Sequence, residues 1–159
     1  MAIVMSIDGI RGAAITHEHE GWLVLDSFRW GGTRGILKQS SASGRQIATA
    51  VAPQLKAVTV TRASDIASPE IWLLMLSSTR KLVRFSWLRT GPGGVTPYMR
   101  LELEDALITS MSETAGLAPP VETIELTYTK VTLSVINVGN ALSGPQDVVS
   151  YTLPQALRA

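Results

Sequence analysis

The chain of 159 residues contains no cysteine, only two histidines and few charged side chains. Without cysteine there is no disulfide framework and no thiolate metal site. Charged residues make up 17% of the chain, below the usual quarter, and the formal net charge is only +1. Such a small charge gives no field that would attract nucleic acid or a membrane surface. The low charged fraction suits a subunit whose surface is partly covered in a larger assembly, and it also fits a neutral monomer.

We also expect no export leader, and the sequence has no long hydrophobic run. Residues 1–12 contain no basic segment before the apolar residues, and Asp8 interrupts the apolar run. We therefore expect no Sec signal peptide. The apolar run at residues 71–76 is far too short to cross a bilayer, so we expect no membrane insertion.

One segment, from about Ser68 to Thr79, predicts a short α-helix. Ser68 is a good N-cap residue, and Pro69 suits the first helical position because its missing N–H costs nothing there. The six residues after Glu70 are all apolar, and a helix that is apolar on every side should be buried. We therefore expect one buried core helix. Its expected core residues are Trp72, Leu73 and Leu76.

The rest of the chain has the alternation of strands. Strands are predicted at residues 3–7, 22–30, 55–62, 81–90, 98–104, 106–111 and 148–153. Residues 121–138 predict one long bent strand or two strands that meet at Lys130. The alternation shifts near Ser27, which indicates a bulge, and a kink is expected at Asp105. Many short strands with one helix predict a mainly β fold. We expect a small β-barrel or sandwich of two antiparallel sheets, in a single domain of residues 1–159.

The segment from Gly31 to Gly44 is rich in glycine and serine, so it can bury little and predicts a long loop. Ile36 and Leu37 lie in its middle, and two adjacent apolar side chains there need a partner surface. We expect this loop to project and to contact a neighbouring subunit or ring. The residues expected at this contact are Gly31, Gly32, Thr33, Arg34, Gly35, Ile36, Leu37 and Lys38.

No group of residues in the sequence indicates a reaction. His17 and His19 could begin a zinc site, but no cysteine or further histidine can complete it. The chain has no G-x-S-x-G elbow, and the glycines at residues 91–94 lack the Lys-Ser/Thr of a phosphate loop. We therefore expect no enzyme, no metal and no cofactor.

Four segments, in register from the start of the chain to about Val135, carry a resemblance to a known family. They are IDGIRG at residues 7–12, His19 with LVLDSFRWG at residues 23–31, Ser68-Pro69, and residues 98–112 with PVETIELTY at residues 120–128. In these segments the chain resembles Hcp, the tube protein of the bacterial type VI secretion system.

The resemblance implies a non-enzymatic β-barrel with one helix that forms homo-hexameric rings. It implies rings that stack into a tube inside a contractile sheath, with a spike of the VgrG type at the tip and small effector proteins in the lumen. It also implies assembly in the bacterial cytoplasm, followed by secretion without a Sec signal peptide.

Arg29 lies between Phe28 and Trp30, and neighbouring side chains on a strand point to opposite faces. If both rings pack into the core, Arg29 points outward. In a ring that resembles Hcp, one outward face lines the lumen, so we hypothesise that Arg29 faces the channel and favours acidic cargo. A place on the outer wall or in an interface is also open.

Two other functions remain open. One is the tube protein of a phage-tail-like contractile injection particle, which the surrounding operon would decide. The other is a monomeric ligand-binding β-barrel, in which the lumen residues would be apolar and no ring would form.

Overall fold

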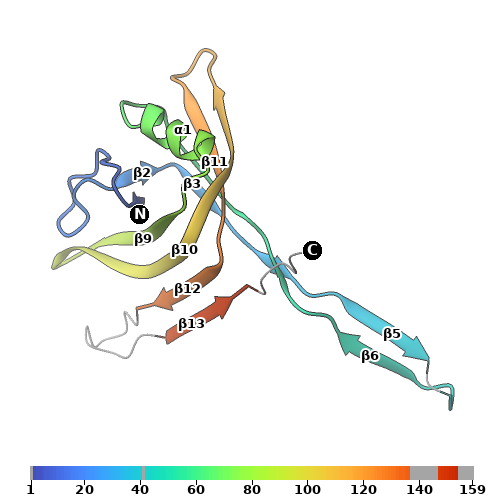
Figure 1. The fold of residues 1–159 in the computed structure, drawn as a ribbon. Coiled ribbons are helices and arrows are strands. Elements are labelled where there is room, and N and C mark those ends of the chain that lie inside the picture. The colour runs from blue at the N-terminus through green and yellow to red at the C-terminus, as the bar shows by residue number, and fades with distance from the viewer. Residues whose placement is uncertain (1, 41, 137–146, 154–159) are drawn as a thin grey trace.

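The computed structural model describes residues 2–40, 42–136 and 147–153. Within these residues the fold is mainly β with one short helix (Figure 1). The elements are β1 (Ala2–Ile7), β2 (Leu23–Leu25), β3 (Ser27–Arg29), β4 (Gly32–Thr33), β5 (Ile36–Ser40), β6 (Gln46–Ala50), β7 (Gln54–Leu55), β8 (Val58–Ala63), α1 (Ser68–Leu76), β9 (Lys81–Gly91), β10 (Gly94–Thr114), β11 (Val121–Thr127), β12 (Lys130–Val135) and β13 (Asp147–Thr152).

The long strand β10 belongs to both of the main antiparallel sheets. Its first half pairs with β9 on one side and β12 on the other, and β1, β2 and β13 extend that sheet. Its second half pairs with β11, which is followed by β8 and β3. The two predicted antiparallel sheets are present in the body and share β10, while β4 with β7 and β5 with β6 form two further two-stranded sheets.

Strands β2 and β3 are consecutive parts of one segment that changes sheets at Asp26. β2 pairs with β1, whereas β3 pairs with β8 and the amide of Asp26 donates to the carbonyl of Thr61 at 2.8 Å. This change of sheet explains the shift in alternation near Ser27. β2 and β3 are the first and last strands of the hydrogen-bonded order, so the backbone at Asp26 connects them, and they do not pair with each other. Over the described residues, no sheet closes into a barrel.

The predicted kink at Asp105 is present. Asp105 has a φ of 51°, and the ladder with β9 slips between Leu103 and Ala106. The chain nevertheless continues as one strand of 21 residues, where the sequence predicted two. Residues 121–138 form two strands, β11 and β12, as one of the two alternatives predicted; residues 137 and 138 lie outside the described part of the chain.

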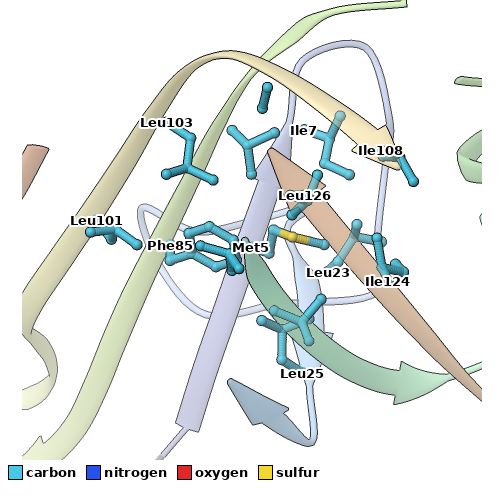
Figure 2. Close-up of a cluster of buried hydrophobic side chains, with 14 of the residues drawn as sticks. Met5, Ile7, Leu23, Leu25, Phe85, Leu101, Leu103, Ile108, Ile124 and Leu126 are labelled. Carbon is cyan, nitrogen blue, oxygen red and sulfur yellow. The ribbon is translucent and has the colours of Figure 1, made fainter. Parts of the chain in front are cut away.

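The core fills the space between the two sheets (Figure 2). Alternate side chains of each strand point inward, such as Leu101 and Leu103 on β10 and Ile124 and Leu126 on β11, and these four are at most 1% exposed. Phe85 on β9 packs among them and is fully buried. Each such side chain contributes about 1.5–3 kcal/mol through its removal from water.

Helix α1 packs against β10 with one face only, so the expectation of a helix buried on every side is wrong. Ile71 is fully buried, but Leu73 is 63% exposed, Leu76 is 72% exposed and Trp72 is only partly buried. The physical reason is that a sheet covers one face of a helix, and nothing in the described subunit covers the other. The helix ends at Leu76, three residues before the predicted end.

The start of α1 also differs from the prediction. Its N-cap is Ala67, without a side-chain cap. The hydroxyl of Ser68 instead accepts from the amide of Asp65 at 3.0 Å, and the carboxylate of Asp65 accepts from the amide of Ala67 at 2.8 Å. The turn before the helix therefore supplies the hydrogen bonds expected from the cap.

The segment predicted as a long loop is a β-hairpin that projects from the body (Figure 1). Strands β5 and β6 pair over five residues each, and all ten residues are exposed. The ladder satisfies the backbone hydrogen bonds without any core, which is how a segment poor in large apolar residues stays regular. We call residues 31–56 the arm. Its projection is confirmed, but its description as an irregular loop is wrong.

Candidate functional site

The root of the arm is fixed to the body through a buried tyrosine. The indole Nε1 of Trp30 donates to the hydroxyl of Tyr128 at 2.6 Å, and this hydroxyl donates to the carbonyl of Lys56 at 2.8 Å. The amide of Lys56 in turn donates to the carbonyl of Gly31 at 2.8 Å. Burial raises the pKa of Tyr128, against the opposing hydrogen bond from Trp30, so the phenol remains a donor. Both ends of the arm are thereby held together and tied to the body at Tyr128, the residue that follows β11.

An apolar hollow of about 190 Å³ opens beside this root. It lies between the last part of the arm and strands β12 and β13. The residues that line it are Trp30, Pro53, Leu55, Val131, Leu133, Val149 and Tyr151. Because Val149 is 61% exposed, this hollow is open to solvent in the single subunit.

Arg29 is exposed, as predicted, and lies at the end of β3. It lines an open hollow of about 280 Å³, together with Trp30, Gly31, Lys56, Ala57, Thr59 and Glu125. Phe28 packs edge-on against Phe85 and Trp87, with ring centroids 5.0 and 4.7 Å apart. The inward place of Phe28 thus turns Arg29 outward, at the junction of arm and body. Two cations, Arg29 and Lys56, and one acid, Glu125, lie at this hollow.

A cluster of charged side chains lies beneath α1. Arg62 and Glu122 form an ion pair although they are only 2% and 0% exposed, and Arg62 also contacts Asp65 at 2.6 Å. The hydroxyl of Ser68, on the helix, lies 3.3 Å from the Glu122 carboxylate. Burial acts to raise the pKa of Asp65, but the hydrogen bonds from Arg62 and from the amide of Ala67, together with the charge of Arg62, lower it below its usual value. The cluster therefore ties the start of the helix to β8 and β11.

Two carboxyl groups meet in this cluster. Glu113 on β10 and Glu122 on β11 are direct partners in the ladder. Burial, and then the facing Glu113, raise the pKa of Glu122 in spite of its bond with Arg62. Burial also acts to raise the pKa of Glu113. Hydrogen bonds from the hydroxyl of Ser64 and from the indole of Trp72, the latter at 2.9 Å, nevertheless hold the pKa of Glu113 below its usual value. Of the two carboxyl groups, Glu122 therefore keeps its proton to a higher pH than Glu113 does.

The two histidines do not form a metal site. His19 is 4% exposed, its Nε2 lies 3.1 Å from the hydroxyl of Ser86, and its ring packs edge-on against Trp22 at 4.7 Å. His17 is exposed on a turn rather than beside His19 on a strand. Over the described residues, no group of three or more His, Asp or Glu side chains is arranged to hold a metal ion. His19 is therefore a packed structural residue.

Sequence reasoning missed the Arg62–Glu122 pair, although the signal was present. Arg62 continues the inward positions of Val58 and Val60 on β8. Glu122 shares its strand face with Ile124 on β11. A charged residue in phase with buried neighbours on two paired strands indicates a buried ion pair.

Among the described residues, no helix is long and apolar enough to cross a membrane, since α1 has only nine residues.

The comparisons with known proteins agree with one another. Residues 4–135 match the model of a family described as "Type VI secretion system effector, Hcp". A type VI secretion system effector from Yersinia pestis has 19% identity and a TM-score of 0.74, with 95% of this chain and 99% of that chain covered. Hcp3 from Pseudomonas aeruginosa has 23% identity and a TM-score of 0.62, with 96% and 99% covered. Hcp1 from Salmonella typhimurium has 19% identity and a TM-score of 0.74, with 95% and 93% covered. At these identities the structures show a shared fold. No curated protein matches the sequence closely enough to count as a relative.

Proposed function

The chain belongs to the Hcp family and is a tube or effector protein of type VI secretion, and from this premise we propose that it forms homo-hexameric rings that stack into a tube. The family match carries the proposal, because it spans most of the body and the whole arm. The low charged fraction of 17% supports it, since a ring subunit exposes less surface to water than a monomer does.

The arm supports assembly with other copies. Ile36, Leu37 and Ile47 are between 53% and 64% exposed and are grouped on one short hairpin, and a group of exposed apolar side chains marks an interaction site. An isolated two-stranded hairpin is marginally stable in water, so the arm needs a partner surface to hold its apolar residues. We therefore assign residues 31–38 to a contact with a neighbouring subunit or ring.

Arg29 is proposed to line the channel of the ring. Its support is the outward position at the mouth of the cationic hollow beside Lys56. Guanidinium groups repeated around a channel would attract acidic effectors. Arg29→Glu should leave rings intact and reduce co-purification of an acidic effector, whereas Arg89→Glu, on the exposed part of β9, should change neither. Unchanged effector binding by the Arg29→Glu ring would remove Arg29 from the cargo surface.

The remaining partners follow from the family. A tube of this kind would carry a spike of the VgrG type at its tip, stand inside a contractile sheath and hold effector proteins in its lumen. It would be assembled in the bacterial cytoplasm and secreted with the spike. Its role would be that of a scaffold and carrier rather than of an enzyme.

The alternative functions have less support. A ligand-binding barrel needs an interior cavity, but the space between the sheets is filled by buried side chains (Figure 2). The tube of a phage-tail-like particle would share the same assembly, and only its operon would distinguish it.

Negative-stain electron microscopy of the purified protein tests the proposal. We expect rings with a central channel, and short stacks of rings at high protein concentration. Single particles of subunit size at every concentration would overturn the proposal.

A further inference from the structure

The arm is the basic part of a chain whose remainder is acidic. Residues 31–56 contain four cations and no acidic residue. The fourteen cations of the chain, less these four, leave ten against thirteen acids, so the remainder has a net charge of −3. The overall charge of +1 therefore hides a strong separation between arm and remainder. The four cations of the arm are Arg34, Lys38, Arg45 and Lys56.

The arm is apolar on both of its faces. In the ladder, Leu37 faces Thr49 and Ile47 faces Gln39, which places Leu37 and Ile47 on the same face. Ile36 faces Ala50 on the other. A surface that receives the arm must therefore offer apolar contact together with negative charge.

The outward face of α1 has both properties. We define this face as the exposed residues spaced three or four apart along the helix and its approach, which therefore lie on one side. They are Ile66, Pro69, Glu70, Leu73 and Leu76. Ile66, Leu73 and Leu76 are 95%, 63% and 72% exposed. These side chains form an unpartnered apolar face with one carboxylate in its middle.

The charge around this face is negative. At the start of α1, a hollow of about 280 Å³ is lined by Asp65, Ile66 and Glu70, with Arg11 on its other wall. Glu113 lies beneath the helix and keeps a lowered pKa, so it is charged. The charge of Arg62 is already matched by its contacts with Asp65 and Glu122.

The arm and α1 lie at opposite ends of the molecule. Figure 1 shows α1 at one end of the body and the hairpin of β5 and β6 extending away from the other. One subunit therefore cannot place its own arm on its own helix. A contact between the two surfaces must join different copies, and such a head-to-tail contact repeats from copy to copy.

We propose that the outward face of α1 is the docking site for the arm of a second copy of this chain. This inference rests on the proposed tube function and adds the receiving surface of the contact. Apolar side chains of the arm cover Leu73 and Leu76, while its cations meet Glu70 and the acidic residues around it.

A disulfide experiment tests the docking directly, because the chain has no native cysteine. In the double variant Leu37→Cys with Leu73→Cys, mild oxidation should link copies into a ladder of dimers, trimers and larger species on a denaturing gel. A disulfide requires close approach of the two residues, so the ladder reports the contact itself. The matched control is Leu37→Cys with Val95→Cys, since Val95 is also exposed, at 46%. The control should stay monomeric on the gel.

The outcomes separate this inference from the proposed function. Rings on the electron microscope without a ladder, or an equal ladder in the control, would overturn the docking site and leave the tube standing. A monomeric mass for the unmodified protein would overturn the tube itself, and the docking site with it.

A charge exchange gives an independent readout. Glu70→Lys should weaken stacking by about tenfold, the size expected for loss of one good interfacial contact. Lys38→Glu or Arg34→Glu, added to it, should restore part of that loss. Unchanged stacking in Leu73→Asp, with binding of an effector or of the sheath lost instead, would assign this face to that partner and overturn the proposal.

Discussion

At the scale of single residues, α1 shows how burial and composition differ. Ile71 and Leu73 are two apolar residues, two positions apart in the same helix. Ile71 is fully buried against the body, whereas Leu73 is 63% exposed. A run of apolar residues predicts a helix that avoids water, but it does not say whether its own subunit or a second one covers each face.

This contrast gives the first prediction. Ile71→Ala should lower the free energy of unfolding of the isolated subunit by about 2–5 kcal/mol, because it leaves a cavity in the core. Leu73→Ala should change it by no more than about 0.5 kcal/mol, because the side chain already meets water. Denaturant melts of dissociated subunits measure both values. Equal losses in the two variants would show that the outward face is covered within the subunit.

Trp72 is intermediate between these two residues. It is only partly buried, and its indole donates to Glu113. We therefore expect Trp72→Ala to cost about 2 kcal/mol, less than the 3–5 kcal/mol typical of a fully buried tryptophan. Trp72→Phe keeps a ring but not the N–H, and should cost about 1 kcal/mol in the same melt. A loss of about 4 kcal/mol or more for Trp72→Ala would show instead that Trp72 is buried like a core residue.

The carboxyl pair beneath α1 predicts a dependence of stability on pH. The pKa of Glu122 is raised above its usual 4.5, so the folded state holds its proton more strongly than the unfolded chain does. Its contribution to stability is therefore largest at low pH and is lost as the pH rises through the raised value. Asp65 and Glu113 have lowered pKa values, so their contribution is lost as the pH falls through those values.

Glu122→Gln isolates the first effect, because the amide stands in for the protonated acid. Above about pH 4.5, as the pH rises through the raised pKa of Glu122, the natural subunit should lose stability relative to this variant. The loss on the acidic side, from Asp65 and Glu113, should remain in both proteins. Thermal melts across this range test the sign. A constant difference between the two proteins would show that Glu122 does not titrate there.

At the scale of elements, the arm is the segment for which sequence reasoning was partly right. Its small residues excluded a core, and Ile36 and Leu37 indicated a surface contact. The pairing of β5 with β6 was not predicted, because neither strand has a buried face and the alternation of apolar and polar residues that marks a strand is therefore missing. The body strands were predicted because each has an inward face. The kink at Asp105 and the change of sheet at Asp26 appeared in the sequence as breaks in alternation.

Removal of the arm gives a prediction at this scale. The amide of Val51 donates to the carbonyl of Gly35 at 2.8 Å, so residues 36–50 can be replaced by a two-residue Asn-Gly turn with little strain. The body should keep its stability to within about 0.5 kcal/mol, because all ten residues of β5 and β6 are exposed. Stacking of rings should be lost. Stacks equal in length to those of the intact protein would show that the arm has no part in assembly.

The root of the arm gives a second prediction for this element. Tyr128→Phe removes the hydroxyl that joins Trp30 to Lys56. We expect a loss of about 1–3 kcal/mol, because the Trp30 N–H and the Lys56 carbonyl then lose their partner. Amide exchange should increase at residues 31 and 56, and exchange in β9 should not change. Unaltered exchange at the root would mean that the phenol does not hold the arm.

At the scale of the whole molecule, the subunit exposes apolar side chains that a monomer would cover. Its arm and the outward face of α1 are apolar, lie at opposite ends and have opposite charge (Figure 1). Two different surfaces that match one another build a ring or an open stack rather than a closed two-fold dimer. Each contact between subunits should bury more than about 1,000 Å² in total to be stable. The resemblance in the sequence predicted the family and the ring, whereas the opposite positions of the arm and the outward face of α1 could be recognised only from the fold.

The mass of the protein in solution tests this account most directly. Light scattering coupled to size exclusion, at tens of micromolar protein, should give about six times the subunit mass of 17.1 kDa, with larger species as the concentration rises. A mass of one subunit across that range would contradict the account, because the exposed apolar arm and helix face would then have no partner.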